Sequence, residues 1–204
     1  MDRKSAIDEI ISNGHVVMVL GHVDTGKSTF CRQLASSALE RGLKVGIVDS
    51  DVGQSWIGPP TTIGMKIVDK EPFSTLFPDS FYFVGSITPE RHLLQMIVGT
   101  KCMVEKAISS GAELVIIDTT GLILGRIGRV LKQNKIDIIR PDHLVCFQRD
   151  SELETLIKGV ELYCNKIYRF EPSRFVEKKS QEFRAKYRQE QFNKYFSESE
   201  IQDI

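Results

Sequence analysis

Hydrophobic and polar residues alternate along the chain in two patterns, one typical of buried strands and the other of amphipathic helices. Continuous apolar runs of strand length favour strands buried on both faces. These runs cover residues 15–21, 44–51, 80–85, 112–121 and 142–148, and residues 165–170 form a possible sixth strand. Isoleucines at helical spacing predict a helix over residues 6–13 that ends at Gly14. A second amphipathic helix is predicted over 28–42, with four side chains inward: Phe30, Leu34, Ala38 and Leu39.

The order of these elements indicates the fold class. A further helix is expected to begin at Thr88 and Pro89, as N-cap and first-turn residue, and to run to about Gly111. Strands that alternate with helices pair in parallel through right-handed crossovers. We therefore expect an α/β three-layer sandwich with a mostly parallel central sheet. In such folds the ligand lies at the carboxyl ends of the strands.

Composition is ordinary for a globular protein, with 41% apolar and 26% charged residues, so one domain over residues 1–204 is expected. We find neither an apolar stretch long enough to cross a membrane nor the apolar run of a signal peptide, and a cytoplasmic location is expected. The four cysteines, without a CxxC pair, are expected to be buried thiols. The formal net charge is +0, but residues 125–140 and 165–196 are locally basic, which suits a bound polyanion.

The loop after the first predicted strand carries the firmest chemical signal. Its sequence, GHVDTGKST, matches the pattern G-x-x-x-x-G-K-[ST] between a buried strand and a helix. Backbone N–H groups of such a loop wrap nucleotide phosphates, and its lysine and hydroxyl, here Lys27 and Ser28, reach the β- and γ-phosphates and Mg²⁺. The predicted nucleotide-binding residues are Gly21, His22, Val23, Asp24, Thr25, Gly26, Lys27, Ser28 and Thr29.

Two predicted strands end in acidic residues that compete for one role. Asp118 ends the run VIIDTTG, and Asp49 and Asp51 end GIVDSD. An Asp in this position holds Mg²⁺ in P-loop proteins, usually through water. If Asp118 serves the metal, a second acid near the γ-phosphate is free to accept the proton of an attacking hydroxyl. The residues alone leave open whether Asp49 or Asp51 binds metal, acts as a base, or only forms the turn before Gly53.

The C-terminal segment predicts a basic helix over about 177–198. Arg184 and Arg188 lie one turn apart and share a face, as do Phe192 and Phe196. Two arginines on a helix that closes over a transferring phosphate would stabilise its charge. Composition alone favours a simpler interpretation, in which this helix presents a solvated charged face beside an aromatic anchor.

Five motifs together resemble, in order and spacing, the polynucleotide 5′-hydroxyl kinases of RNA processing. The motifs are GHVDTGKSTFCR, VDSDVGQ, VGSITP, DTTGL and KSQEFRAKYRQEQFNKYF. That family includes the kinase subunit of the eukaryotic pre-mRNA cleavage machinery and its archaeal homologues. The resemblance covers the chain from about His15 to Phe196. It implies a P-loop NTPase fold, a C-terminal lid helix and Mg²⁺ as cofactor.

The resemblance also implies roles for single residues. Asp51 falls on the acid that activates the RNA 5′-hydroxyl and helps to arrange the magnesium. The lid arginines fall on Arg184 and Arg188, which reverses the preference for a merely solvated helix. The implied catalytic residues are Lys27, Asp51, Arg184 and Arg188. The implied metal residues are Ser28, Asp49, Asp51 and Asp118. The implied substrate and clasp residues are Gln54, Thr119, Thr120, Gly121 and Leu122.

The chain departs from the family pattern in three places. Leu122 stands where the clasp tryptophan stacks on a terminal base, so the sequence preference is not carried over. His22 stands where proline is common, and Lys179 replaces a further lid arginine of eukaryotic members. We expect none of the flanking β-rich domains that help to bind the nucleotide base in larger members, which leaves the choice between ATP and GTP open.

The leading hypothesis is Mg²⁺-dependent transfer of the γ-phosphate of ATP or GTP to the 5′-hydroxyl end of RNA or DNA, with no membrane partner. The alternative is a nucleotide-hydrolysing switch or assembly GTPase or ATPase without a nucleic-acid acceptor, and a third is a non-catalytic nucleotide-binding subunit. An apparent guanine motif, NKID at 134–137, is discounted because it ends a basic helical stretch instead of following a buried strand. Trp56 is expected to anchor its loop, or else to cover the substrate channel.

Overall fold

The computed structural model describes residues 2–72, 77–161, 164–173 and 178–200. The helices in these ranges are α1 (Arg3–Asn13), α2 (Lys27–Glu40), α3 (Leu93–Ser109), α4 (Gly125–Ile139), α5 (Glu154–Val160) and α6 (Gln181–Tyr195). The strands are β1 (Val16–Gly21), β2 (Val45–Ser50), β3 (Thr62–Val68), β4 (Ser80–Phe83), β5 (Leu114–Thr119), β6 (His143–Phe147) and β7 (Lys166–Phe170).

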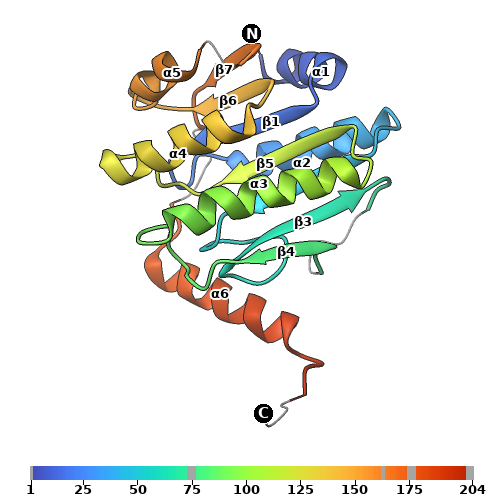
Figure 1. Ribbon diagram of the computed structural model, residues 1–204, viewed down its shortest axis with the longest axis vertical. Helices are drawn as coiled ribbons and strands as arrows, with labels where there is room; N and C mark the ends of the chain where they lie inside the picture. The colour runs from blue at the N-terminus through green and yellow to red at the C-terminus, as the bar shows by residue number, and fades with distance from the viewer. Residues whose placement is uncertain (1, 73–76, 162–163, 174–177, 201–204) are drawn as a thin grey trace.

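The strands form one twisted sheet in the order β4-β3-β2-β5-β1-β6-β7 (Figure 1). From β2 to β7 the neighbours pair in parallel, which confirms the prediction of a mostly parallel sheet. Two antiparallel strands, β3 and β4, extend it at one edge. The sequence patterns did not predict β3. The prediction of a buried strand at 80–85 is wrong, because β4 is an edge strand whose alternate side chains are exposed.

Helices cover both faces of the sheet, as the three-layer prediction requires (Figure 1). Alternate residues of β1 show the division: Met18 and Leu20 pack into one apolar cluster with α3, α4 and α5, whereas Val17 and Val19 pack into another with α1 and α2. Burial of both faces explains the unbroken apolar runs of the parallel strands. Helix α6 is different, because it buries none of its residues and extends away from the body (Figure 1).

The expected helix start at Thr88 and Pro89 is wrong, because α3 begins only at Leu93. The carbonyl of Pro89 accepts a hydrogen bond from the amide of His92 at 3.0 Å. Arg91 adopts a left-handed conformation, with φ at 65°. A left-handed residue breaks a right-handed helix, so Thr88 and Pro89 form a turn that precedes the helix.

Burial also changes two expectations drawn from composition. Cys102 is exposed, so the prediction of buried thiols fails there, while Cys31 and Cys146 are buried. The basic stretch 125–140 is divided, because Lys132 and Lys135 are fully buried in the core. A search for membrane-spanning helices among the described residues finds none of sufficient length and hydrophobicity.

Candidate nucleotide and phosphoryl-transfer site

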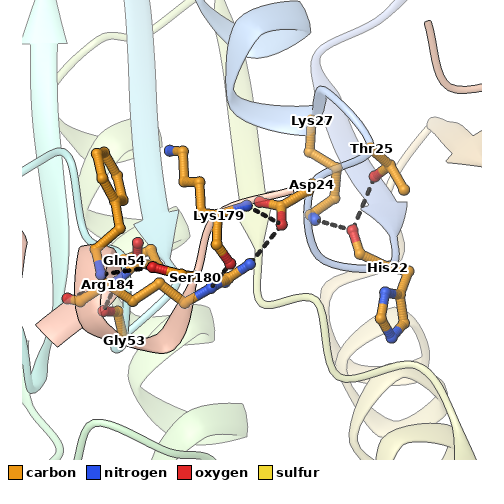
Figure 2. Close-up of polar contacts among 10 residues, drawn as sticks. His22, Asp24, Thr25, Lys27, Gly53, Gln54, Lys179, Ser180 and Arg184 are labelled. Atoms are coloured by element: carbon orange, nitrogen blue, oxygen red, sulfur yellow. Dashed lines mark hydrogen bonds and ion pairs between the residues drawn. The ribbon is translucent and has the colours of Figure 1, made fainter. Parts of the chain in front are cut away.

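The predicted phosphate-binding loop connects the end of β1 to the start of α2. It contains glycine where the backbone demands it: Gly26 has φ at 91°, and a Cβ on Gly21 would lie 2.7 Å from Thr25 Oγ1. The first N–H groups of α2 therefore face the loop, with the positive end of the helix dipole behind them. Lys27 Nζ donates to the carbonyl of His22 at 2.7 Å, and Thr25 Oγ1 donates to the same carbonyl at 2.8 Å (Figure 2).

A cavity of about 980 Å³ lies over this loop. Its lining includes the loop from Val23 to Thr29, Asp51 and Gln54, and from the C-terminal segment Lys178, Lys179, Ser180, Phe183, Arg184 and Tyr187. The loop, the VDSDVGQ motif and the C-terminal segment are far apart in sequence, and the fold brings all three to one cavity. The prediction that they act together is consistent with this arrangement.

The three acids at the strand ends differ in burial: Asp49 and Asp118 are buried, and Asp51 is half-buried. Asp49 and Asp118 lie side by side in the register of β2 and β5, and both are buried. Burial raises the pKa of Asp49 well above its usual range, and the charges of Asp118 and Asp51 raise it further. Burial also raises the pKa of Asp118, and the positive charge of Lys27 opposes that rise.

The hydrogen bonds of Asp49 tie it to its own loop. Its Oδ1 accepts from the amide of Asp51 at 3.0 Å, and its Oδ2 accepts from the amides of Trp56 and Ile57 at 2.6 and 3.1 Å. These bonds make Asp49 the support of the turn that follows β2. The metal role predicted for Asp49 stays a prediction, and its carboxylate is already engaged.

Trp56 supplies a contact that the sequence did not indicate. The residue is buried, as expected for a loop anchor, and its Nε1–H donates to Asp118 Oδ2 at 3.0 Å. The guanidinium of Arg32 lies 4.5 Å from the centre of its ring. The other oxygen, Asp118 Oδ1, is buried and has no hydrogen-bond partner among the described residues. Trp56 therefore orients a carboxylate that keeps one oxygen uncommitted.

Of the three acids at the strand ends, Asp51 is the one that lines the cavity. Its Oδ1 accepts hydrogen bonds from the amides of Gly53 and Gln54, both at 3.1 Å, so the loop fixes the direction of the carboxylate. Gln54 Nε2 donates to the carbonyl of Gly53 at 2.7 Å and to the carbonyl of Arg184 at 3.4 Å. This glutamine links the Asp51 loop to the C-terminal helix (Figure 2).

The predicted clasp does not line this cavity. Thr119 is buried and donates to the carbonyl of Val19 at 2.7 Å, which is a bond between neighbouring strands. Leu122 is half-buried against the core, and its amide donates to Thr120 Oγ1 at 3.4 Å. Gly121 allows close contact with the phosphate-binding loop, since a Cβ there would lie 2.4 Å from Val23 Cγ1. The clasp thus packs beside the loop, and its role with substrate stays a prediction.

The C-terminal helix closes one side of the cavity. Ser180 caps α6 by accepting from the amide of Phe183, and the described helix begins four residues after the predicted start at 177, which lies outside the described residues. Arg184 forms an ion pair with Asp24 at 2.5 Å, with side chains only 20% and 11% exposed. The amide of Lys179 donates to the same Asp24 oxygen at 3.1 Å (Figure 2). Tyr187 adds a bond from its hydroxyl to the carbonyl of Ser55 at 2.9 Å.

Arg188 is placed differently from Arg184. It lines a second hollow on α6, together with Gln181, Glu182, Arg184 and Ala185. The two arginines share that hollow, as their spacing predicts, but only Arg184 also reaches the large cavity. The segment NKID lies inside α4 and does not follow a buried strand, which agrees with the prediction that it is not a guanine motif.

Comparison with known proteins agrees with this geometry. Residues 21–198 match the family described as the mRNA cleavage and polyadenylation factor CLP1 P-loop. A polyribonucleotide 5′-hydroxyl-kinase of Pyrococcus furiosus is 40% identical over 98% of this chain and 56% of its own length. A protein of the same name in Methanocaldococcus jannaschii is 40% identical over 92% of this chain and 52% of its own. The chain thus spans about half the length of the curated relatives it matches.

Solved structures support the fold. The wild-type Clp1p–Pcf11p complex contains a chain that superposes with a TM-score of 0.78 at 16% identity, covering 94% of this chain and 52% of that one. The kinase domain of the Escherichia coli tyrosine kinase ETK gives a TM-score of 0.51 at 13% identity, covering 87% of this chain and 74% of that one. At these identities the likeness concerns the arrangement of helices and strands.

Proposed function

The chain belongs to the family described as the mRNA cleavage and polyadenylation factor CLP1 P-loop, and from that membership we propose that it acts as a polynucleotide 5′-hydroxyl kinase. In the proposed reaction the γ-phosphate of ATP or GTP passes to the 5′-hydroxyl end of RNA or DNA. One observation carries the proposal: Asp51 lines the same cavity as Lys27 and Arg184. This transfer needs a base, a cation that binds phosphate and an arginine that stabilises the transferring group, and these are the roles of Asp51, Lys27 and Arg184.

The donor nucleotide would place its phosphates over the N-terminus of α2. The N–H groups of residues 21–29 would bind them, with Lys27 at the β- and γ-phosphates. Lys27 would then exchange its bond with the carbonyl of His22 for a bond with phosphate. Arg184 would likewise leave Asp24 and turn to the transferring group, where a guanidinium stabilises the developing charge.

The acceptor would approach from the side of Asp51. Its 5′-oxygen forms the new bond to the γ-phosphorus, the bond from that phosphorus to the β,γ-bridging oxygen breaks, and the nucleoside diphosphate leaves with the electron pair. The hydroxyl proton passes to the Asp51 carboxylate, whose orientation is set by the amides of Gly53 and Gln54. Arg188 would serve a later part of the strand or the lid, as its place on the second hollow suggests.

The donor set fits a magnesium ion. Asp118 Oδ1, buried without a hydrogen-bond partner among the described residues, is a suitable hard ligand. When bound, Mg²⁺ neutralises charge on the β- and γ-phosphates. Ser28, Asp118 and Asp51 would hold it. Within the described ranges no group of three or more His, Cys, Asp or Glu side chains is arranged to hold a metal, which suits an ion that takes several ligands from the nucleotide and water.

We place the remaining predicted residues in the same scheme. Residues 1–204 act as one P-loop kinase unit with a C-terminal lid, and Gln54 joins the Asp51 loop to that lid. The clasp Thr119–Leu122 would contact the acceptor beside Val23, with Leu122 giving weaker base stacking than an aromatic residue. A cytoplasmic location stays a prediction from the sequence.

A transfer assay tests the proposal. The protein is incubated with Mg²⁺, ATP or GTP labelled at the γ-phosphate, and single-stranded RNA or DNA that ends in a 5′-hydroxyl. Label should appear on at least one oligonucleotide and should fall strongly in Lys27→Ala. If no oligonucleotide gains label with either nucleotide, the kinase proposal fails. Strong hydrolysis without oligonucleotide that is unchanged by Arg184→Ala would support the alternative switch instead.

A further inference from the structure

Helix α4 buries two lysines beneath the proposed site. Lys132 and Lys135 lie one turn apart and have 0% exposure. An ammonium group in a protein core is costly unless hydrogen bonds or opposite charges compensate it. Lys132 Nζ donates to the carbonyl of Thr120 at 2.7 Å and contacts Thr120 Oγ1 at 3.4 Å. Lys135 Nζ donates to Ser50 Oγ at 2.8 Å.

The acceptors of these two bonds lie at the strand ends that carry the chemistry. Ser50 is the last residue of β2 and directly precedes Asp51. Its own hydroxyl donates to the carbonyl of Asp118 at 3.1 Å, so Ser50 ties together the ends of β2 and β5. Thr120 follows the last residue of β5 and lies in the predicted clasp. Helix α4 therefore holds both the Asp51 loop and the clasp, the two segments that the proposed function assigns to the acceptor oligonucleotide.

Burial and the neighbouring charges both act on the pKa values of the two lysines. Burial lowers the pKa of Lys135, the carboxylates of Asp51 and Asp49 oppose that shift, and the net pKa is about 7. Burial likewise lowers the pKa of Lys132, and the nearby positive charge of Lys135 lowers it further. Both side chains are fully buried, so the strand-end oxygens and acids are the groups that compensate the lysines.

We propose that Lys135 and Lys132 are positioning residues for the acceptor half of the site: Lys135 fixes the Asp51 loop through Ser50, and Lys132 fixes the clasp through Thr120. The inference rests on the proposed kinase function, because acceptor phosphorylation is the activity that uses both segments. Neither lysine reaches the large cavity, so both act through the residues that they hold.

The two lysines should therefore affect different kinetic parameters. Lys135→Met keeps an unbranched side chain, one atom shorter, and removes the ammonium group; loosening the Asp51 loop should lower kcat about 100-fold with little change in the KM of the oligonucleotide. Lys132→Met should raise that KM about 10-fold, because a charge-assisted bond to the clasp is lost. Lys106→Met, on the exposed face of α3, is the matched control and should change neither parameter.

Thermal unfolding separates this effect from misfolding. Removing one partner of a buried polar contact leaves the other unpaired, so both lysine variants should unfold at a lower temperature than the wild type, and kinetics are compared well below the lowest Tm of the set. Ser50→Ala then tests the route of the effect. If Lys135 acts through Ser50, the double variant Lys135→Met/Ser50→Ala loses no more kcat than Lys135→Met alone. Fold-losses that multiply, or an unchanged kcat in Lys135→Met, would overturn the proposal.

Hydrogen exchange gives a readout that does not need the kinase activity. Amides of residues 50–56 should exchange at least about 10-fold faster in Lys135→Met than in wild type, and those of 119–122 faster in Lys132→Met. Equal exchange in each variant and wild type would refute the positioning roles. If the wild type phosphorylates no oligonucleotide, the proposed function fails, and exchange alone still decides whether the lysines hold these segments.

Discussion

The hydrogen bond between Trp56 and Asp118 offers a quantitative test of how the site is built. Trp56→Phe keeps a buried aromatic ring but removes the Nε1–H that donates to Asp118 Oδ2 at 3.0 Å. The variant leaves Asp118 Oδ2 without this donor, so the buried carboxylate is stabilised, among the described residues, only by Lys27 and Ser28 nearby. A lost hydrogen bond to a charged group costs about 1.5–3 kcal/mol.

That cost should be visible in thermal unfolding. For 204 residues, the entropy of unfolding is about 0.4 kcal/mol/K, so a loss of about 2 kcal/mol lowers Tm by about 5 °C. The bond favours the ionised form of Asp118, so removing it raises the pKa of Asp118 above the already raised wild-type value. The stability that the bond contributes is present where Asp118 is ionised and is lost as the pH falls through its folded pKa. The difference in Tm should therefore be larger above neutral pH than in acid.

The same variant should alter the response to metal. Removing a group that orients a metal ligand typically lowers metal affinity about 10- to 100-fold, so the Mg²⁺ concentration for half-maximal transfer should rise by about that factor. Asp118→Asn provides the control background, in which Trp56→Phe should cost less because no charge is left unbonded. An unchanged Tm together with an unchanged Mg²⁺ requirement would refute the reasoning that Trp56 orients Asp118.

Three further predictions concern the cavity and the thiols. Asp51→Asn should lower kcat for transfer about 10²- to 10⁴-fold in steady-state kinetics and leave nucleotide affinity in equilibrium binding nearly unchanged. If weaker nucleotide binding is the main defect, Asp51 belongs to the site of the donor nucleotide instead. Arg184→Ala should lower kcat about 10³-fold and free Asp24, whereas a normal kcat would show that the pair only closes the empty cavity. At mildly alkaline pH, iodoacetamide should label the exposed Cys102 first. Burial raises the pKa of Cys146 to about 12 and that of Cys164 to about 11, which suppresses their reactive thiolates. Mass spectrometry that shows Cys146 modified as fast as Cys102 would contradict this prediction.

Sequence patterns predicted the strands that are buried on both faces of the sheet. The parallel strands β1, β2, β5 and β6 lie between helices on both faces, so their apolar runs are unbroken. The phosphate-binding loop was equally clear, since its glycines and lysine are required by the backbone and by phosphate. Strand β4 was misjudged because it is the edge of the sheet and its alternate side chains are exposed. Strand β3 is mostly buried but was missed because Thr62, Gly64 and Lys66 interrupt its apolar sequence.

Local pattern could not separate the acids or place the lysines. Asp49 and Asp118 each end an apolar run, and what distinguishes them is Trp56, whose amide bonds the first and whose indole bonds the second. Lys132 and Lys135 occur in a stretch rich in cations that composition assigns to the surface. Their burial depends on oxygen atoms at residues 50 and 120, which only the folded chain brings to α4. Tertiary contacts of this kind leave no periodic signal in the sequence.

The most direct test of the proposed function compares two RNA oligonucleotides of identical sequence, one ending in a 5′-hydroxyl and the other in a 5′-phosphate. With γ-labelled ATP or GTP and Mg²⁺, wild-type protein should label the 5′-hydroxyl RNA alone, and Asp51→Asn should nearly abolish that labelling. Label on neither RNA, with the labelled phosphate released to water at the same rate whether or not oligonucleotide is present, would contradict the assignment of this chain as a polynucleotide 5′-hydroxyl kinase.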